Sequence, residues 1–155
     1  MDLVIETAGA PSPEIVALLA ELDAALAGPY EPDQHHALSL EELFQPHVRF
    51  FVARSEGVAV ACGGVAFIDG YAEVKRMYAK PSVRGRGVAR ALLRRLEEEA
   101  RAAGASLLRL ETGLYQEEAL RFYEGASFRR RGPFGPYAEM PPRAIALSVF
   151  YEKTL

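Results

Sequence analysis

The stretch Ser82-Val-Arg-Gly-Arg-Gly-Val-Ala-Arg-Ala-Leu-Leu-Arg-Arg-Leu96 decides the fold of this chain. A strand-like run ends at Pro81, a Gly-Arg-Gly turn follows, and an amphipathic helix begins at once. Glycines let backbone N–H groups approach a ligand closely, and a helix N-terminus adds unpaired donors and partial positive charge. Arg84 and Arg86 add full charges. The segment therefore predicts an anion site, and a diphosphate is its natural ligand.

Two common diphosphate-binding motifs are absent from this loop. A Walker loop requires Gly-x-x-x-x-Gly-Lys-Ser/Thr, and the chain has no such string. A dinucleotide fingerprint requires a third small residue, but Arg90 stands at that position, where it would obstruct close packing of the helix on the strand. The loop therefore belongs to neither class of nucleotide-binding protein.

What remains is a six-residue pattern that resembles the Gln/Arg-x-x-Gly-x-Gly/Ala signature of the GCN5-related N-acetyltransferase superfamily. In that family, the loop amides hold the pyrophosphate of acetyl-coenzyme A. The resemblance implies that the same cosubstrate is held here by Arg84, Gly85, Arg86, Gly87, Val88 and Ala89. Taken alone, the six residues are also compatible with a solvated basic helix start.

A second motif lies downstream. The segment from Gln116 through Ala119-Leu-Arg-Phe-Tyr-Glu124 to Phe128 is similar to the family's Asn-x-x-Ala-x-x-Phe/Leu-Tyr-Glu-x-x-Gly-Phe pattern. Gln116 replaces the usual Asn, and Ser127 replaces the usual Gly. The two motifs occur in the family's order, and the resemblance covers roughly residues 45–155. It implies that Gln116 contributes to cosubstrate binding.

Acyl transfer to an amine needs a neutral nucleophile and a proton for the leaving thiolate. The resemblance implies that Tyr123 lies beside the sulfur, and a phenol has a pKa of about 10, near that of an aliphatic thiol. Packing at the end of its helix is the alternative for Tyr123. Glu73 is the candidate base, as in histone acetyltransferases with a similar Ala-Glu-Ile context. A strand ion pair with Lys75 is its alternative.

The strand that leads into the phosphate loop also matters. In the family this strand splays from its neighbour at a bulge, and its amides bind the pantetheine arm. The corresponding residues here are Met77, Tyr78 and Ala79. Arg76 precedes them, and it is predicted either to contact a carboxylate-bearing substrate or to form a surface salt bridge.

Acceptor-binding candidates come from two loops. His36, in the loop of residues 28–38, could contact substrate or relay a proton, although loop histidines are often simply exposed. Tyr137, in the Gly/Pro-rich loop of residues 131–143, could cover the acceptor site. Cys62 is predicted to be a small core residue. No metal site is expected, because His47 has no neighbouring ligands.

Bulk properties fit one enzyme domain, spanning residues 1–155. The net charge of −3 gives no general attraction to nucleic acid or anionic membrane. A single cysteine and the absence of a visible signal peptide favour a reducing cytoplasm. No run approaches the roughly 20 apolar residues that would span a bilayer. A homodimer is possible.

Periodicity and turn residues predict an α/β fold, with helices flanking a mixed central sheet in an α/β/α sandwich. Expected helices begin at Pro13, near Ser39 with a capping box to Glu42, at Val88 and at Gln116. Expected strands cover residues 3–7, 48–54, 58–68, 71–79, 107–112 and 145–151.

The resulting hypothesis is an acetyl-coenzyme A-dependent N-acetyltransferase that acts on a small amine or amino-acid-like acceptor by direct transfer in a ternary complex. Acetylation of a protein lysine or N-terminus is a second hypothesis, and it would need an open groove with acidic walls. A regulatory module that binds acyl-coenzyme A without turnover is a third. Closure of the acceptor pocket by residues 28–38 and 131–140 would favour a small molecule.

Overall fold

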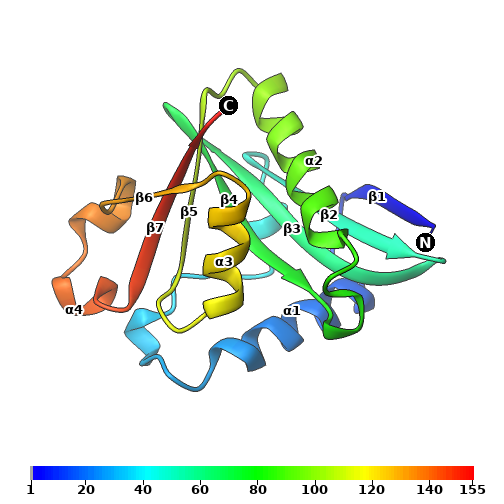
Figure 1. Ribbon diagram of the computed structural model, residues 1–155, viewed down its shortest axis with the longest axis horizontal. Helices are drawn as coiled ribbons and strands as arrows, with labels where there is room; N and C mark the ends of the chain where they lie inside the picture. Colours follow the sequence, from blue (N-terminus) through cyan, green and yellow to red (C-terminus); the bar gives the residue numbers. More distant parts are fainter. Residues whose placement is uncertain (1) are drawn as a thin grey trace.

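A seven-stranded mixed sheet runs through the centre of the computed structural model, which describes residues 2–155 (Figure 1). The strand order is β1-β2-β3-β4-β5-β7-β6, and every neighbouring pair is antiparallel except β4 and β5. The strands are β1 (Leu3–Ala8), β2 (Val48–Ser55), β3 (Val58–Ile68), β4 (Tyr71–Ala79), β5 (Leu107–Gly113), β6 (Arg129–Arg131) and β7 (Ser148–Thr154).

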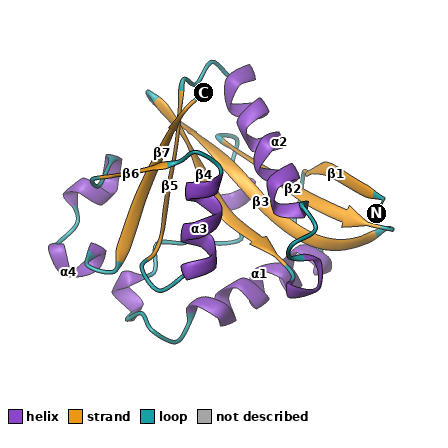
Figure 2. Ribbon diagram, in the orientation of Figure 1, coloured by secondary structure: helices purple, strands orange, loops and turns teal. Residues whose placement is uncertain are grey.

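Helices cover both faces of this sheet (Figure 2). The helix after the phosphate loop, α2 (Val88–Ala102), and α3 (Glu117–Gly125) pack on one face, around buried Leu92, Leu96 and Tyr123. On the other face, α1 (Pro13–Leu26) packs through Ile15 and Leu18. Short turns complete that face: η1 (Pro32–Gln34), η2 (Glu42–Phe44), η4 (Gly135–Glu139) and α4 (Pro142–Ile145).

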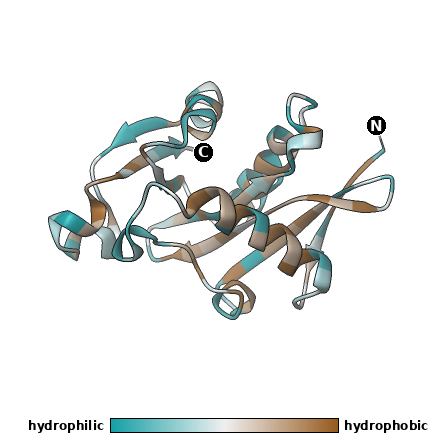
Figure 3. Cartoon of the chain, turned by 90° about the horizontal axis from the view of Figure 1, so that it is seen from below, coloured by the Kyte–Doolittle hydropathy of each residue, from teal (hydrophilic) through white to brown (hydrophobic). Residues whose placement is uncertain are grey.

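The hydropathy of the chain follows these layers. Hydrophobic residues concentrate in the central strands, whereas many loops at the periphery are hydrophilic (Figure 3). In β3, nine of the eleven residues from Val58–Ile68 are apolar and the other two are glycines, as expected for a strand covered on both faces. Among the described residues, no helix combines the length and the hydropathy that crossing a bilayer requires.

The β4 strand separates from its parallel neighbour soon after it begins. It pairs with β5 at two positions, Ala72 with Leu108 and Glu73 with Arg109. Its register with β3 then shifts between Cys62 and Gly64, so one extra residue of β4 is accommodated in a bulge. Beyond this point β4 continues without a β5 partner, and a space opens between the two strands.

Most predicted elements are confirmed. The Ser12 side chain caps α1 by accepting a hydrogen bond from the Ile15 amide, and Ser39 and Glu42 form the expected reciprocal capping contacts. The last strand was misplaced: β7 begins at Ser148, because the Pro/Arg segment before it forms α4. The predicted loop of residues 131–143 likewise contains η4 and the start of α4.

Candidate active site

A groove of about 760 Å³ lies between the free part of β4 and helix α3. One wall carries Met77, Tyr78 and Ala79, the three residues expected to present backbone groups. The opposite wall is formed by residues 115–119 and 121–123. At one end the groove reaches the loop between β4 and α2, so a long, flexible ligand can extend from this loop into the interior.

The loop end of the groove fits a diphosphate. Gly85 and Gly87 have φ values of +78° and +80°, a left-handed conformation that favours glycine, and a Cβ at either position would meet no atom within 4 Å. Gly87 caps α2 with no side-chain hydrogen bond. The amides of the first turn, those of Val88, Ala89 and Arg90, therefore lack intrahelical partners, and these three residues line the groove.

Two arginines of this loop differ in their position. Arg84 lines the groove, where its Nε donates to the Ala79 carbonyl at 3.2 Å and its guanidinium lies over the Tyr78 ring. The exposed Arg86 is not among the residues that line the groove, and its amide donates to the Val83 carbonyl within a turn. The structure thus brings together five of the six predicted phosphate-loop residues, and Arg86 lies outside them.

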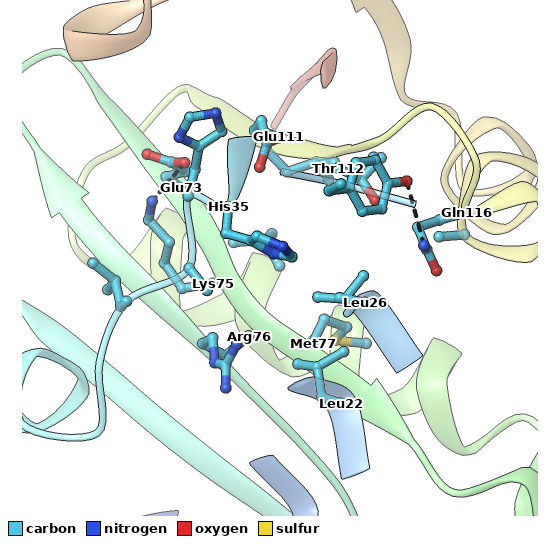
Figure 4. Close-up of a pocket in the computed structure, with 18 of the residues that line it drawn as sticks. Leu22, Leu26, His35, Glu73, Lys75, Arg76, Met77, Glu111, Thr112 and Gln116 are labelled. Carbon is cyan, nitrogen blue, oxygen red and sulfur yellow. Dashed lines mark hydrogen bonds and ion pairs between the residues drawn. The ribbon is translucent and has the colours of Figure 1, made fainter. Parts of the chain in front are cut away.

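A smaller chamber of about 170 Å³ adjoins the groove on the side of the sheet covered by α1 (Figure 4). The walls of the chamber come from β4, β5, α1, the segment of residues 30–38 and Tyr137 of η4. The groove and the chamber share Leu22, Met77, Gln116, Ala119 and Tyr123. These two hollows therefore meet where β4 and β5 have separated.

Glu73 is buried in the chamber wall, with 4% of its surface exposed. Its Oε2 accepts a hydrogen bond from the Tyr137 hydroxyl at 2.7 Å, and the same oxygen forms an ion pair with Lys75 Nζ at 2.8 Å. Lys75 Nζ also donates to the Tyr137 hydroxyl at 3.1 Å. The ion pair with Lys75, the alternative role considered for Glu73, is present. The other oxygen, Oε1, has no hydrogen-bond partner among the described residues.

A second carboxylate, Glu111 on β5, also lines the chamber, and the sequence analysis did not single it out. Burial raises the pKa of Glu111, although Ser148 Oγ donates to its Oε2 at 2.6 Å. The alternation of side chains between the two faces of a strand could have revealed Glu111. Leu108 and Leu110 on β5 are buried against α2, so Arg109 and Glu111 lie on the opposite face.

Tyr123 stands at the junction of the two hollows. It packs edge-on against Phe122 and Phe128 and is 6% exposed. Burial raises the pKa of Tyr123, so the phenol stays protonated at neutral pH. No described residue forms a hydrogen bond with its hydroxyl. The helix carrying it ends at Gly125, and Ser127, two residues further on, adopts φ +74°, a conformation that accounts for the glycine usual at this position.

The N-terminus of α3 is tied to the chamber by Tyr30, a residue that carried no signal in the sequence. The Tyr30 hydroxyl accepts hydrogen bonds from the Tyr115 amide at 3.0 Å and from Gln116 Nε2 at 3.3 Å. A Cβ on Gly113 would overlap the Tyr30 hydroxyl, so this close packing requires glycine. Gln116, in the position of the family's Asn, thereby helps to fix the chamber wall.

The predicted acceptor residues His36 and Tyr137 both line the chamber. His36 Nε2 donates to the Ala144 carbonyl at 2.7 Å, and its ring packs edge-on against Tyr137. In the neutral ring, Nδ1 is therefore the unprotonated nitrogen. Arg76 also lines the chamber, but its guanidinium is directed away from Glu73 (Figure 4) and pairs with Asp23 on α1 at 2.8 Å.

The described residues contain no group of three or more His, Cys, Asp or Glu side chains arranged to hold a metal ion. Cys62 is buried beside the bulge, where its thiol donates to the Arg76 carbonyl at 3.7 Å. Burial raises the pKa of the Cys62 thiol to about 12. The thiolate, which is the nucleophilic form, is therefore scarce at neutral pH.

We predict that Cys62 does not react with 5,5′-dithiobis(2-nitrobenzoate) in the folded protein at pH 8, because the thiol is buried and its raised pKa keeps it protonated. The same reagent should titrate one thiol per chain in denaturant. The release of thionitrobenzoate, followed by absorbance, measures both. Rapid labelling of the native protein would contradict the placement of Cys62.

Comparison with known proteins identifies the family of this chain. Residues 16–128 match the acetyltransferase (GNAT) family. An IAA acetyltransferase of Azospirillum brasilense is 48% identical over 144 residues, 91% of this chain and 90% of the relative. A solved structure assigned as an acyl-CoA N-acyltransferase, from Klebsiella pneumoniae, has a TM-score of 0.83 and 35% identity over 99% of this chain and 97% of that chain.

A more distant structure shares the fold. The PaiA N-acetyltransferase of Thermoplasma acidophilum, solved in complex with coenzyme A, has a TM-score of 0.73 at 19% identity, with both chains covered completely. The family match over most of the chain and the strong similarity to the Azospirillum relative are decisive. The chain therefore belongs to the GNAT family of acetyltransferases.

Proposed function

We propose that this enzyme transfers the acetyl group of acetyl-coenzyme A to the primary amine of a small, amino-acid-like acceptor, directly and within a ternary complex. One observation carries the proposal: a long groove ending at a phosphate-type loop meets a small chamber at Tyr123. Two substrates held in the two hollows would have their reacting groups next to each other, which is the main requirement for direct transfer.

The groove fits the cosubstrate. The free amides of Val88, Ala89 and Arg90 and the left-handed turns at Gly85 and Gly87 support diphosphate binding. The unpaired part of β4 supports strand-like hydrogen bonding to the pantetheine arm through Met77, Tyr78 and Ala79. When bound, acetyl-coenzyme A supplies the reactive thioester.

The chamber supports a small acceptor over a protein chain. Residues 34–38 and Tyr30 close one side of the chamber, and Tyr137 closes another. A space of about 170 Å³ accommodates a small molecule, whereas a protein acceptor would have to insert an extended side chain into it. The carboxylates of Glu73 and Glu111 on its wall favour a cationic amine.

In the proposed mechanism, Glu73 Oε1 takes a proton from the acceptor ammonium, directly or through water. Its Oε2 is held by Tyr137 and Lys75, so the carboxylate is fixed in orientation while Oε1 has no partner among the described residues. The neutral amine then attacks the thioester carbonyl, so that a C–N bond forms and the C–S bond to the leaving thiolate breaks. Tyr123 gives its phenolic proton to that thiolate. The nitrogen loses its second proton as the amide forms, and this proton returns to the phenolate through water. His36 and water are the alternative bases.

The experiment that tests the function is a screen for coenzyme A release over amines, amino acids and aminoglycosides, with IAA included because it names the Azospirillum relative. Amine-dependent release of the thiol, with an acetylated amine identified by mass spectrometry, is the expected result. If coenzyme A is released with peptides as acceptors and with none of the small amines, the small-acceptor assignment is wrong.

The first variant tests the phosphate loop. Gly87→Asp should abolish coenzyme A binding, because it strains a left-handed position and adds a negative charge beside the diphosphate. Gly57→Asp is the matched control, since Gly57 has φ +81° in the β2–β3 turn. Isothermal titration that gives equal affinities for the two folded variants would refute the assignment.

The second variant tests the proton donor. Tyr123→Phe keeps the ring packing and removes the hydroxyl, so kcat should fall by about 10²–10⁴ while coenzyme A binding persists. Tyr151→Phe is the control, because this buried neighbour bonds Glu124 instead. Steady-state kinetics provide the measurement, and an unchanged kcat for Tyr123→Phe would reduce this residue to a packing role.

The third variant tests the base. Glu73→Gln keeps size and removes basicity, so kcat/KM should drop at pH 7 and recover as pH approaches the pKa of the free amine. Glu97→Gln removes another buried carboxylate, one paired with Lys153, and should leave the pH profile unchanged. If the pH–rate profile of Glu73→Gln runs parallel to that of the wild type, Glu73 has no part in proton removal.

A further inference from the structure

The bulge in β4 places two consecutive side chains, those of Lys75 and Arg76, on the same face of the sheet. Before the bulge, Ala72 and Val74 pack toward α2; after it, Met77 and Ala79 do so. In a regular strand the side chains of residues i and i+2 lie on the same face, so the Arg76 side chain would lie with that of Val74 on the face covered by α2. Instead Arg76 adopts φ +55°, rare for a residue with a side chain, and its guanidinium lies against α1.

The Arg76 guanidinium is buried without a full set of partners. Its side chain is 6% exposed. Nη2 donates to the Leu19 carbonyl at 3.5 Å, whereas Nε and Nη1 have no hydrogen-bond partner among the described residues. Asp23 Oδ1 lies 2.8 Å from Nη1, but this contact lacks hydrogen-bond alignment, and the Asp23 side chain is 63% exposed. A buried guanidinium normally has its donors satisfied by an anion.

Arg76 also lies where two hollows meet. A second hollow of about 370 Å³, which we call the outer hollow, lies between α1 and the segment of residues 37–40. It shares Ala37, Leu38 and Arg76 with the chamber. The Arg76 side chain therefore borders both hollows, and the outer hollow continues from it toward Val16 and Leu19 of α1.

The other basic side chain of the chamber is already engaged. Lys75 is held by Glu73 and Tyr137, so it is committed to orienting the carboxylate proposed as base. Arg76, in contrast, presents planar donors that match a carboxylate in a two-point contact. The chamber is thus lined by carboxylates that suit an ammonium group and by a guanidinium whose carboxylate partner, Asp23, is largely exposed.

We propose that Arg76 is a specificity residue that binds a carboxylate of the acceptor, so that the preferred substrates are primary amines carrying a carboxylate, with amino acids as the simplest case. The inference rests on the proposed function. The acceptor's carboxylate displaces the exposed Asp23 from the guanidinium, and its amine remains near Glu73. The strained backbone at Arg76 is what delivers the guanidinium to this position.

The test uses matched pairs of acceptors that differ by the carboxylate: L-leucine with isopentylamine, and L-phenylalanine with 2-phenylethylamine. The wild-type enzyme should favour the amino acid in kcat/KM. In Arg76→Gln, the ratio of amino acid to matched amine should fall about 10- to 100-fold. Arg49→Gln, which removes an arginine paired with Glu99 outside both hollows, should leave the ratio unchanged.

Asp23→Asn provides an independent reading, even if Arg76→Gln fails to fold. Removing the competing carboxylate should lower KM for the amino acid relative to its matched amine. If amines are acetylated but neither variant changes the ratio, Arg76 has a structural role and the inference fails. If no amine is acetylated, equilibrium titration with L-leucine decides: binding weakened in Arg76→Gln supports the carboxylate site, and equal or absent binding overturns it.

Discussion

The strands β4 and β5 separate soon after they begin to pair, and this separation creates the site. Two parallel strands that pair at two positions leave the remainder of β4 without a partner on that side. Buried backbone N–H and C=O groups without hydrogen bonds destabilise a protein. An unpaired strand edge of this kind is therefore suited to bind an extended ligand or to be covered by another element. The groove, the chamber and the junction at Tyr123 all lie along this opening.

The C-terminal segment contributes to the site through the contacts of Tyr137 with Glu73 and Lys75. Tyr137 belongs to η4. It forms an aromatic cluster with Tyr71, Phe134 and Phe150, and this cluster packs η4 against the sheet. Its hydroxyl bonds Glu73, and Lys75 bonds both. The segment before β7 therefore both closes the chamber and orients the carboxylate proposed as base, which couples the shape of the acceptor site to its chemistry.

Local patterns predicted the elements well, because hydrophobic period, caps and turns are properties of neighbouring residues. The phosphate loop and the Ser39–Glu42 capping box are examples. Tyr30 and Glu111 were missed because their roles depend on contacts with residues distant in sequence. The direction of Arg76 could not be predicted for the same reason. Side chains alternate between the faces of a regular strand, but a bulge interrupts this alternation, and the bulge depends on pairing with β3. β7 was misplaced because α4 interrupts the preceding segment.

In the proposed reaction, two substrates occupy adjoining hollows and react without an acetylated enzyme. Initial-velocity kinetics with both substrates varied, combined with mass spectrometry of the enzyme after incubation with acetyl-coenzyme A alone, distinguish this direct transfer from transfer through an acetyl-enzyme. Direct transfer gives intersecting double-reciprocal lines and an unmodified protein mass. Parallel lines together with a protein heavier by one acetyl group would show that an acetyl-enzyme forms instead.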